Sequence, residues 1–296
     1  MKQRITPLLL TAALLCAIAA PCQAESSVWR VEKGGHRMYL GGTVHMLKPE
    51  EFPLPAEFAT AYNDSQELVF EADIGTLSDP DTQAKLLQSA LAQPGRQLKE
   101  LLSESTYRQF AEAVTQRGLD IGVIGQFKAG MAMTSLQAVE LMRLGYSPEG
   151  VDSYFYQKAG REQKPRRYLE SLEGQFAYLN AMGEGQEELF VQQSLAELKE
   201  MAEQINHIIK AWRSGDSRAL EQWAIGDMQR DYPKLYQSLL VSRNQQWMPK
   251  LEKMANSPQV EFVLVGVAHM VGKQGLLNML QQRGYTVSVL RQDRKD

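Results

Sequence analysis

The stretches YLGGTVH (residues 39–45) and LVGVAHMVG (residues 264–272) follow one pattern near opposite ends of a chain of 296 residues. In each, an apolar run typical of a buried strand leads into a glycine, and a histidine, His45 or His269, stands three residues after it. The chain has only four histidines, so half of them obey this rule. Ligands of open α/β sheets gather at the carboxyl ends of the strands. The repeated pattern predicts that both ends of the chain supply strands to one sheet, with a site where these strands end.

The rest of both ends alternates between strand and helix patterns. Residues 26–42 indicate two strands around a turn at residues 33–36, which is a hairpin signal. Residues 54–65 fit a short helix, and ELVFEADIG, residues 67–75, fits a third buried strand. Residues 260–290 contain a strand, a glycine turn, a helix, a glycine stop and a strand. This βαβ-like order favours parallel pairing in a covered sheet.

The middle of the chain, residues 80–256, is dominated by helical periodicity. One apolar stripe with steps of three and four marks a long helix and consists of Leu195, Leu198, Met201, Ile205, Ile208 and Trp212. An Ala- and Met-rich stretch from residue 129 predicts a more buried helix, and residues 166–171 predict a short strand. The sequence therefore predicts an α/β (α+β) fold, in which a mixed sheet from residues 25–79 and 257–296 carries a large helical insertion.

Residues 1–24 have the features of a secretory signal peptide. Lys2 and Arg4 form a basic start, LLLTAALLCAIAA forms an apolar core that is short for a membrane span, and small residues precede Glu25. We expect cleavage after Ala24, which leaves one domain of residues 25–296. A periplasmic location in a Gram-negative bacterium, or secretion, follows from this expectation. An uncleaved anchor is the alternative.

Such cleavage would also limit the chemistry and the partners of the mature protein. Both cysteines, Cys16 and Cys22, would be removed, so neither a disulfide nor a thiolate could act. Thirty basic side chains would remain against 35 acidic ones, which does not favour nucleic acid or an anionic membrane as a partner. The sequence contains no second long apolar run, so we expect no stable membrane insertion. The expected partner is a peptide or another small molecule, and the oligomeric state is left open.

A carboxylate completes the predicted site. The third strand ends near Glu71 and Asp73, at a place comparable to His45 and His269. Two imidazoles and one carboxylate suit Zn²⁺, Mn²⁺ or a similar ion with positions left for water and substrate. Such an ion would activate water, while a second carboxylate, Asp73 or Glu170, acts as general base. We therefore predict His45, Glu71 and His269 as catalytic metal ligands; the alternative is that each is a hydrogen-bonded structural residue.

Other polar residues receive weaker roles. The residues predicted to bind substrate are Thr43, Glu170, Arg243 and Asn244, and Arg243 is a candidate because its planar fork can hold a carboxylate. His36 in the hairpin turn and His207 on the long helix are predicted to lie outside the site. Asp152 and Tyr154 are interpreted as a helix start. The sequence contains no P-loop, G-x-S-x-G, H-E-x-x-H or G-x-G-x-x-G motif, which leaves the corresponding functions without support.

The order of these motifs resembles the TraB/GumN (PrgY) family. The resemblance rests on LGGTVHMLKPE and VFEAD near the front, GYSPEGVDSYFYQKAGREQKPRRYLESLEGQ in the middle, and SRNQQWMPKLEKM and FVLVGVAHMVGKQGLLNMLQQRGYTV at the back. It covers nearly the whole mature chain. That family is similar to the TIKI metalloproteases, which have paired G-x-x-H motifs and a glutamate needed for peptide cleavage with Mn²⁺ or Co²⁺.

Carried over by position, the resemblance implies His45, His269 and Glu71 for these roles, with Arg243, Asn244 and Glu170 as further members of the pattern. It also implies an α/β fold with a helical part, like that of erythromycin-esterase-like and ChaN-like proteins. The function expected is a periplasmic, metal-dependent peptidase. Two alternatives remain: a protein that binds a peptide or small molecule without cleaving it, and a metal-independent esterase-like hydrolase that uses a histidine as general base.

Overall fold

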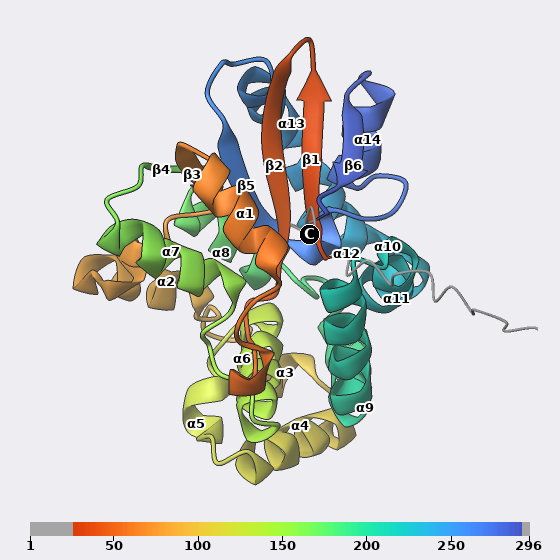
Figure 1. Cartoon of the computed structure of the whole chain (residues 1–296). Helices are drawn as coiled ribbons and strands as arrows, with labels where there is room; N and C mark the ends of the chain where they lie inside the picture. Colours follow the sequence, from red (N-terminus) through yellow and green to blue (C-terminus); the bar gives the residue numbers. More distant parts are fainter. Residues whose placement is uncertain (1–25, 292–296) are drawn as a thin grey trace, which may run out of the picture.

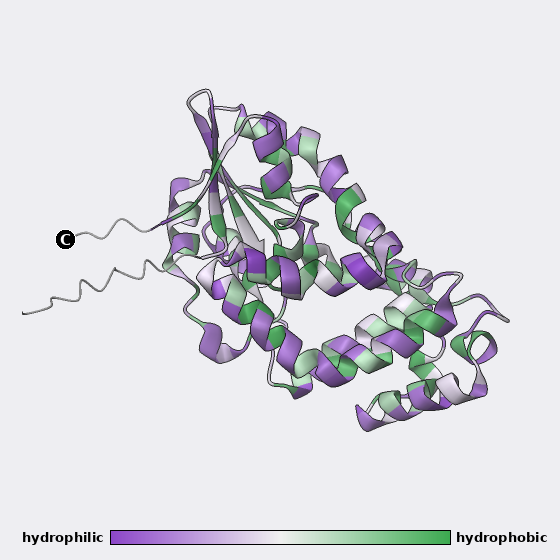
Figure 2. Ribbon diagram, turned by 90° about the vertical axis from the view of Figure 1, so that its right-hand side faces the viewer, coloured by the Kyte–Doolittle hydropathy of each residue, from purple (hydrophilic) through white to green (hydrophobic). Residues whose placement is uncertain are grey.

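The computed structural model describes residues 26–291, so the predicted signal peptide lies outside the described residues. A sheet of six strands forms one part of the molecule, and helices extend from one end of it (Figures 1 and 2). The strands are β1 (Val28–Lys33), β2 (His36–Thr43), β3 (Glu67–Phe70), β4 (Arg166–Tyr168), β5 (Glu261–Gly266) and β6 (Thr286–Val289). Their order across the sheet is β4-β3-β5-β2-β1-β6.

The sheet is mixed, as predicted. β1 and β2 form an antiparallel hairpin, and both residues of its turn, Gly34 and Gly35, have positive φ angles, which glycine adopts without steric cost. β2, β5, β3 and β4 run parallel to one another. In the register of the two central strands, Thr43 is opposite Gly266. The two motifs that share one sequence pattern therefore end side by side.

The last strand differs from the predicted βαβ-like unit. β6 follows helix α14 (Leu276–Gln282), but it pairs antiparallel with β1 and does not pair with β5. β6 and β5 point in the same direction, because β6 is antiparallel to β1 and β1 is antiparallel to β2. The hairpin of β1 and β2 occupies the place beside β5 that a direct βαβ unit would have used. Parallel direction was predicted correctly, and direct pairing was not.

Helices make up most of the remaining chain. Those of the two ends are η1 (Pro49–Glu51), α1 (Ala56–Asp64), η5 (Val267–His269) and α14. Those of the middle are η2 (Ile74–Ser78), α2 (Pro80–Ala90), α3 (Leu98–Leu101), α4 (Glu104–Gln116), α5 (Ile121–Ile124), α6 (Ala129–Arg143), α7 (Val151–Arg161), α8 (Leu172–Asn180), α9 (Glu187–Ser214), α10 (Ser217–Leu220), η3 (Glu221–Ile225), α11 (Gly226–Asp231), α12 (Pro233–Tyr236), η4 (Gln237–Val241) and α13 (Ser242–Ala255). The segments η3 and η4 are π-helical.

The long helix α9 joins the helical part to the sheet. Its Trp212 is fully buried, and the indole Nε1 donates a hydrogen bond of 2.7 Å to the carbonyl of Gly42 in β2. The hydroxyl of Ser27 donates to the carbonyl of Trp212 at 2.8 Å. Gly215 then ends the helix in the left-handed conformation that favours glycine. The helix is thereby fixed three residues before His45.

Two hydrophobic cores correspond to the two parts. The core on the sheet contains the central strands together with Phe58, Phe155 and Trp247. A separate core lies within the helical part and includes Phe110, Met133, Leu136, Val191 and Leu198. Strand β4 is contributed to the sheet by the middle of the chain, as predicted for residues 166–171.

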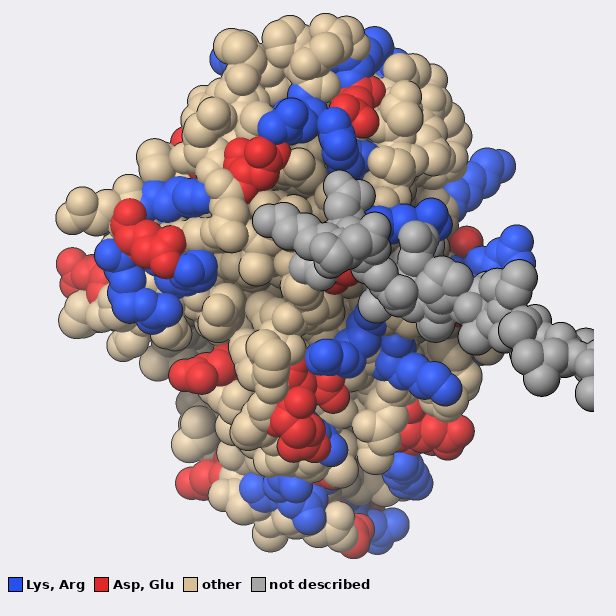
Figure 3. Space-filling view, in the orientation of Figure 1, with Lys and Arg blue, Asp and Glu red and all other residues tan. Residues whose placement is uncertain are grey.

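The surface carries both signs of charge. On the face shown in Figure 3, basic and acidic side chains lie close to one another, and no large area of a single sign is visible. Within residues 26–291, no helix combines the length and the apolar composition that crossing a membrane requires.

Candidate active site

The side chains predicted to form the site converge at the carboxyl ends of β2, β3 and β5. Gly266 shows this most directly, because a Cβ atom at this position would lie 3.3 Å from Oε1 of Glu71 and 3.8 Å from Nε2 of His45. The same position would lie 3.8 Å from Cδ2 of His269. Only a glycine leaves this space open. The predicted proximity of three residues that are up to 224 positions apart is therefore present in the structure.

Glu71 follows the last residue of β3 and is 7% exposed. Its Oε1 accepts a hydrogen bond of 2.7 Å from the backbone N–H of Gly266, and its Oε2 accepts one of 2.7 Å from Gln175. Burial opposes the charge of this carboxylate, but its neighbours His269 and Arg243 and the N–H of Gly266 outweigh burial and lower the pKa of Glu71 to about 2. Glu71 is therefore an anion at neutral pH and is held by donors on both oxygens.

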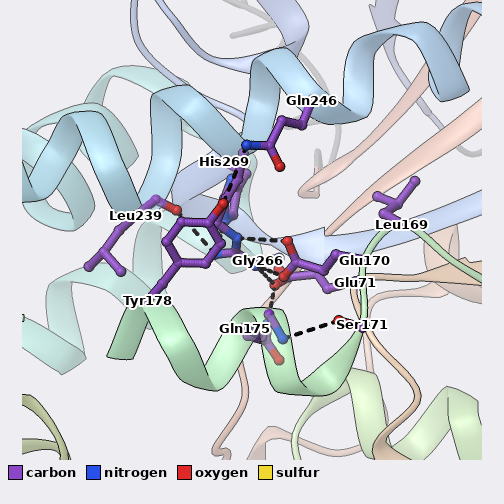
Figure 4. A network of polar contacts seen from close by, with 12 residues as sticks. Glu71, Leu169, Glu170, Ser171, Gln175, Tyr178, Leu239, Gln246, Gly266 and His269 are labelled. Carbon is purple, nitrogen blue, oxygen red and sulfur yellow. Dashed lines mark hydrogen bonds and ion pairs between the residues drawn. The ribbon is translucent and has the colours of Figure 1, made fainter. Parts of the chain in front are cut away.

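Arg243 lies at the centre of the buried network. Its Nη2 lies 2.6 Å from Oε2 of Glu71 and 2.6 Å from Oε1 of Glu170, and its Nε lies 3.1 Å from Oε2 of Glu170. Its Nη1 donates to the carbonyl of Leu239 at 3.1 Å. Figure 4 shows Glu71 and Glu170 directed toward the same region as His269. One guanidinium thus pairs with two carboxylates and binds Glu170 through two of its nitrogens.

His269 is 3% exposed and is held at both ring nitrogens. Its Nδ1 lies 2.7 Å from Oδ1 of Asn244, and its Nε2 lies 3.0 Å from Nη1 of Arg243. Since an arginine can only donate, Nε2 is the acceptor and Nδ1 carries the proton. Burial lowers the pKa of His269 to about 3, although the charge of Glu71 acts in the opposite direction. His269 is therefore a neutral, immobile residue in this arrangement.

His45 has a different environment. Its Nδ1 lies 2.7 Å from Oδ2 of Asp152, while 66% of its side chain is exposed. The negative charge of Asp152 raises the pKa of His45 above its ordinary value of 6.5. Water screens part of this attraction, because the imidazole is exposed. The Nε2 atom points toward the space beside Gly266 and has no hydrogen-bond partner among the contacts of the described residues.

The pair of His45 and Asp152 depends on Gly150. A Cβ atom on Gly150 would lie 2.2 Å from the carbonyl oxygen of Val44 and 2.3 Å from the carbonyl carbon of His45. The absence of a side chain lets the start of α7 pack against this backbone, and the N–H of Val151 donates to the carbonyl of Val44 at 3.0 Å. Asp152 in the first turn of α7 is thereby placed beside the imidazole.

The structure locates the residues predicted to bind substrate as well. Asn244, 1% exposed, orients His269 and donates to the carbonyls of His269 and Gln274, while Glu170 holds Arg243. Thr43 is 2% exposed, and its hydroxyl lacks a hydrogen-bond partner. The contacts of these side chains are thus mainly within the protein, and their binding of substrate stays a prediction.

Three further polar residues lie apart from this network. Asp73 caps η2 by accepting from Gly75 and also accepts from the hydroxyl of Tyr156 at 2.6 Å. The strand stops at Phe70, so Asp73 lies beyond its end and contacts Gly75 and Tyr156, and its role as a general base stays a prediction. His36 begins β2, and His207 stacks on Trp223 in the helical part, so both lie away from the site, as predicted.

Arg243 also affects whether Glu71 and His269 can bind a metal ion. Its guanidinium bridges Glu71 and His269 and uses the Nε2 lone pair that would face an ion. Within residues 26–291, no group of three or more His, Cys, Asp or Glu side chains is arranged to hold a metal ion. A cation at this place would also meet the positive charge of Arg243. In this arrangement the residues do not fit a three-ligand metal centre, and we derive no step through one.

Two members of the site were not assigned to it from the sequence. Asp152 was interpreted as a helix start, which it is, but it also binds His45. Gln175 on α8 binds Glu71 and carries no sequence signal that separates it from a surface glutamine. Gly150 was the sequence signal that could have placed Asp152 in the site. An acidic residue just after a glycine can reach a side chain whose backbone packs closely against that glycine.

The protein is thus an α/β domain in which two histidines and a glutamate stand at strand ends, together with a buried arginine. The chain belongs to the TraB/PrgY/gumN family, whose model matches residues 27–289. It is similar to the uncharacterized protein YbaP of Escherichia coli (strain K12), with 24% identity over 249 residues, which cover 84% of this chain and 89% of that protein. The same values hold for YbaP of Shigella flexneri. No solved structure matches the chain.

Proposed function

We propose that this protein is an exported hydrolase that cleaves peptides, with His45 as the group that transfers protons at the scissile bond. The observation that supports this most strongly is the environment of His45. Its Nδ1 is held by Asp152, and its exposed Nε2 lies next to the space in front of Gly266. A histidine oriented by a carboxylate on one nitrogen and free on the other is suited to general acid–base catalysis.

The proposed reaction uses the residues in distinct roles. Nε2 of His45 takes a proton from water as the water oxygen attacks the peptide carbonyl carbon. The same nitrogen then gives the proton to the leaving amine as the carbon–nitrogen bond breaks, so no proton is gained or lost overall. The floor of this space is formed by the buried side chains of Glu71, Arg243 and His269, whose mutual contacts keep it polar and rigid. Asp152 stabilises the imidazolium form of His45.

Peptide turnover measured by mass spectrometry tests this proposal. The mature chain, residues 25–296, should cleave members of a peptide mixture, and His45→Ala should reduce the rate by about 100-fold or more, the range typical of a lost acid–base group. His36→Ala is the matched control, because His36 is a partly exposed histidine at the start of β2, away from the site. Peptides that bind but are recovered intact would indicate the non-catalytic binding protein. Equal rates in wild type and His45→Ala would refute the role of His45.

A metal-dependent peptidase, implied by the family resemblance, is the second candidate. It is favoured by one observation: the free Nε2 of His45 and the carboxylate of Glu71 flank the same position at Gly266. Mn²⁺, Co²⁺ or Zn²⁺ would supply water activation there. Turnover after dialysis against a strong chelator, with and without added Mn²⁺ or Co²⁺, distinguishes the candidates. Activity that survives the chelator supports the proton-transfer proposal, whereas activity restored only by the ion supports the metal-dependent one.

Export is proposed from the pattern of residues 1–24. Fractionation of Gram-negative cells that express the full chain should place the protein in the periplasm. The amino terminus of the purified protein should begin at Glu25. A protein recovered with residue 1 at its terminus in the membrane fraction would support the uncleaved anchor instead.

A further inference from the structure

A cavity of about 310 Å³ lies among the helices of the middle part of the chain. Its volume is at the lower end of the range for ligand pockets, enough for one or two side chains. Apolar and aromatic residues form most of the lining, and Met133, Leu179, Phe190, Trp223, Met228 and Leu239 are among them. Among the lining residues only Leu239 contacts the network of the candidate site, through its backbone carbonyl, and no lining side chain belongs to that network. The cavity is therefore separate from the proposed catalytic groups.

The charge of this lining is entirely negative. Glu197 of α9 and Asp227 of α11 contribute carboxylates, and no lysine or arginine is present among the lining residues. Asp227 is paired with exposed Arg230 at 2.8 Å. Glu197 accepts a hydrogen bond from the hydroxyl of Tyr232 but has no ion pair with a cation among residues 26–291, and burial raises its pKa. A partly buried carboxylate without a cation is costly for the protein alone, and a cationic ligand would remove that cost.

One polar group in the lining has no hydrogen-bond partner among residues 26–291. The Oγ1 atom of Thr134 in α6 is buried and makes no hydrogen bond. Buried hydroxyls are nearly always hydrogen-bonded in proteins. Thr134 and Glu197 come from different helices, α6 and α9, and both line the same space. The cavity thus combines apolar walls with polar atoms that could bind a donor.

Both π-helical segments contribute to this cavity. Trp223 and Ala224 come from η3, and Leu239 comes from η4. Single π-helical turns are rare and occur often at functional sites, because the extra residue per turn redirects side chains and carbonyls. The ring of Trp223 is fixed by stacking on His207, with centroids 4.0 Å apart and an interplanar angle of 3°.

Two elements connect the cavity with the candidate active site. In η4 and α13, Leu239 lines the cavity and its carbonyl accepts a hydrogen bond from Arg243 at 3.1 Å. In α8, Leu179 lines the cavity and Gln175, one helical turn earlier, binds Glu71. A ligand in the cavity would therefore contact the helices that hold the catalytic network.

We propose that this cavity binds an apolar group that carries a cationic nitrogen, with Glu197 as the residue that recognises the charge. The assignment of that group to a peptide substrate rests on the proposed function. Two sources share the required chemistry: the amino-terminal residue of a peptide, and a lysine beside an apolar residue within it. The aromatic and methionine side chains contact the apolar part, and Glu197 pairs with the ammonium group.

Binding of four related peptides tests this inference. A ten-residue peptide with leucine at its amino terminus and an internal Phe-Lys pair is compared with its acetylated form, its Lys→norleucine form and the form with both changes. Binding to the His45→Ala protein, residues 25–296, is followed by calorimetry and tryptophan fluorescence. Trp223 is only partly buried, whereas Trp29, Trp212 and Trp247 lie in the core, so Trp223 should dominate the fluorescence response. The doubly neutral peptide should bind at least about tenfold more weakly than the parent, since a hydrogen bond to a charged group is lost.

The single changes identify the source of the charge. A loss on acetylation assigns the cavity to the amino terminus, and a loss on replacement of lysine assigns it to the side chain. Glu197→Gln should abolish the preference for charged peptides and leave the affinity for the doubly neutral peptide unchanged. Glu200→Gln is the matched control, because it lies on the same helix, is exposed and does not line the cavity. Ala224→Leu should fill the cavity and weaken all four peptides.

Thermal melting of each variant verifies that it is folded. Equal affinity of wild-type protein for charged and neutral peptides, or an unchanged preference in Glu197→Gln, would overturn the inference. A failure of the proposed function has a different signature: wild-type protein would bind the charged peptides with the stated preference but leave them uncleaved. Conversely, cleavage of neutral peptides without any charge preference would support the hydrolase and refute this use of the cavity.

Discussion

The Nη1 atom of Arg243 lies 3.0 Å from Nε2 of His269, a residue that the sequence pattern assigned to a metal ion. The same guanidinium binds Glu71 and Glu170. A positive charge is thus already present among these side chains, and it belongs to the protein. The two strand-end histidines, which look equivalent in the sequence, differ in role: His269 is buried within this network and His45 is exposed.

Replacement of Arg243 should cost more stability than any surface charge change. Arg243→Met leaves two buried carboxylates without their cation, and we expect a loss of about 3–5 kcal/mol in the free energy of unfolding. Arg230→Met is the control, because Arg230 pairs only with exposed Asp227 and Asp231 and should change stability by less than about 1 kcal/mol. Urea denaturation at pH 7 measures both. A similar small effect for both variants would contradict the central role of Arg243.

The ionisation of His45 should depend on Asp152. Because the negative charge of Asp152 raises the pKa of His45, the proton is retained above pH 6.5, and the neutral form becomes more abundant as the pH rises. Turnover that needs neutral His45 should therefore increase from pH 6 toward alkaline pH. In Asp152→Asn the increase should occur at lower pH, with a reduced maximum because the imidazolium is less stabilised. NMR titration of His45 and pH–rate profiles check this, and a profile that Asp152→Asn leaves unmoved would speak against the pairing.

The buried neutral state of His269 predicts a loss of stability in mild acid. Its folded-state pKa is lowered to about 3 from 6.5, so the unfolded chain binds more protons between these values and stability falls as the pH falls from 6.5. Glu71, with a pKa lowered to about 2 from 4.5, adds its own loss only below about pH 4.5. His45 has a raised pKa, so its contribution is fully present below pH 6.5 and is lost only as the pH rises.

In the window from pH 6.5 to 4.5 the loss from His269 therefore exceeds that from any one carboxylate, because carboxylates bind protons mainly near and below pH 4.5. We expect a decrease of about 2 kcal/mol in this window for the wild-type protein. The decrease should be largely absent in His269→Gln, which has no proton to bind. Urea denaturation at pH 6.5 and pH 4.5 gives the comparison, and equal slopes in the two proteins would contradict a buried neutral His269.

Two glycine substitutions should have separable effects. Gly266→Ala places a methyl group 3.3 Å from Glu71 and into the space next to His45, so turnover should fall strongly with a small change in stability. Gly150→Ala places a methyl group 2.2 Å from a backbone carbonyl, which forces α7 away and should destabilise the fold by about 1–3 kcal/mol. Melting temperatures and peptide turnover of both variants distinguish the two effects. A strong destabilisation by Gly266→Ala with unchanged specific activity would contradict this assignment.

The sequence allowed the sheet and the convergence of the site to be predicted because both depend on local patterns. Apolar runs that end in glycine mark buried strands, and the shared rule for His45 and His269 indicates that their strands end at one edge. The observed register, with Thr43 opposite Gly266, agrees with that rule. Family membership agrees with the same motifs across residues 27–289.

Other features could not be predicted, because they depend on distances between residues that have no pattern in common. β6 lies next to β1 because β2 occupies the position beside β5, and the sequence does not show which strand takes that position. The packing of α13 decides whether Arg243 contacts substrate or the neighbouring carboxylates. The sequence does not distinguish these two cases. The partnership of His45 with Asp152 spans 107 residues and depends on the close approach at Gly150.

The pairing of β2 with β5 has a consequence for the timing of folding. These strands are central neighbours, yet more than two hundred residues separate them along the chain. Contacts of such long range form late and slowly. A polypeptide that ends before residue 261 lacks the middle of its sheet, the N–H that binds Glu71, and His269. The sheet and the buried network around Glu71 can therefore be completed only after β5 and His269 have been synthesised.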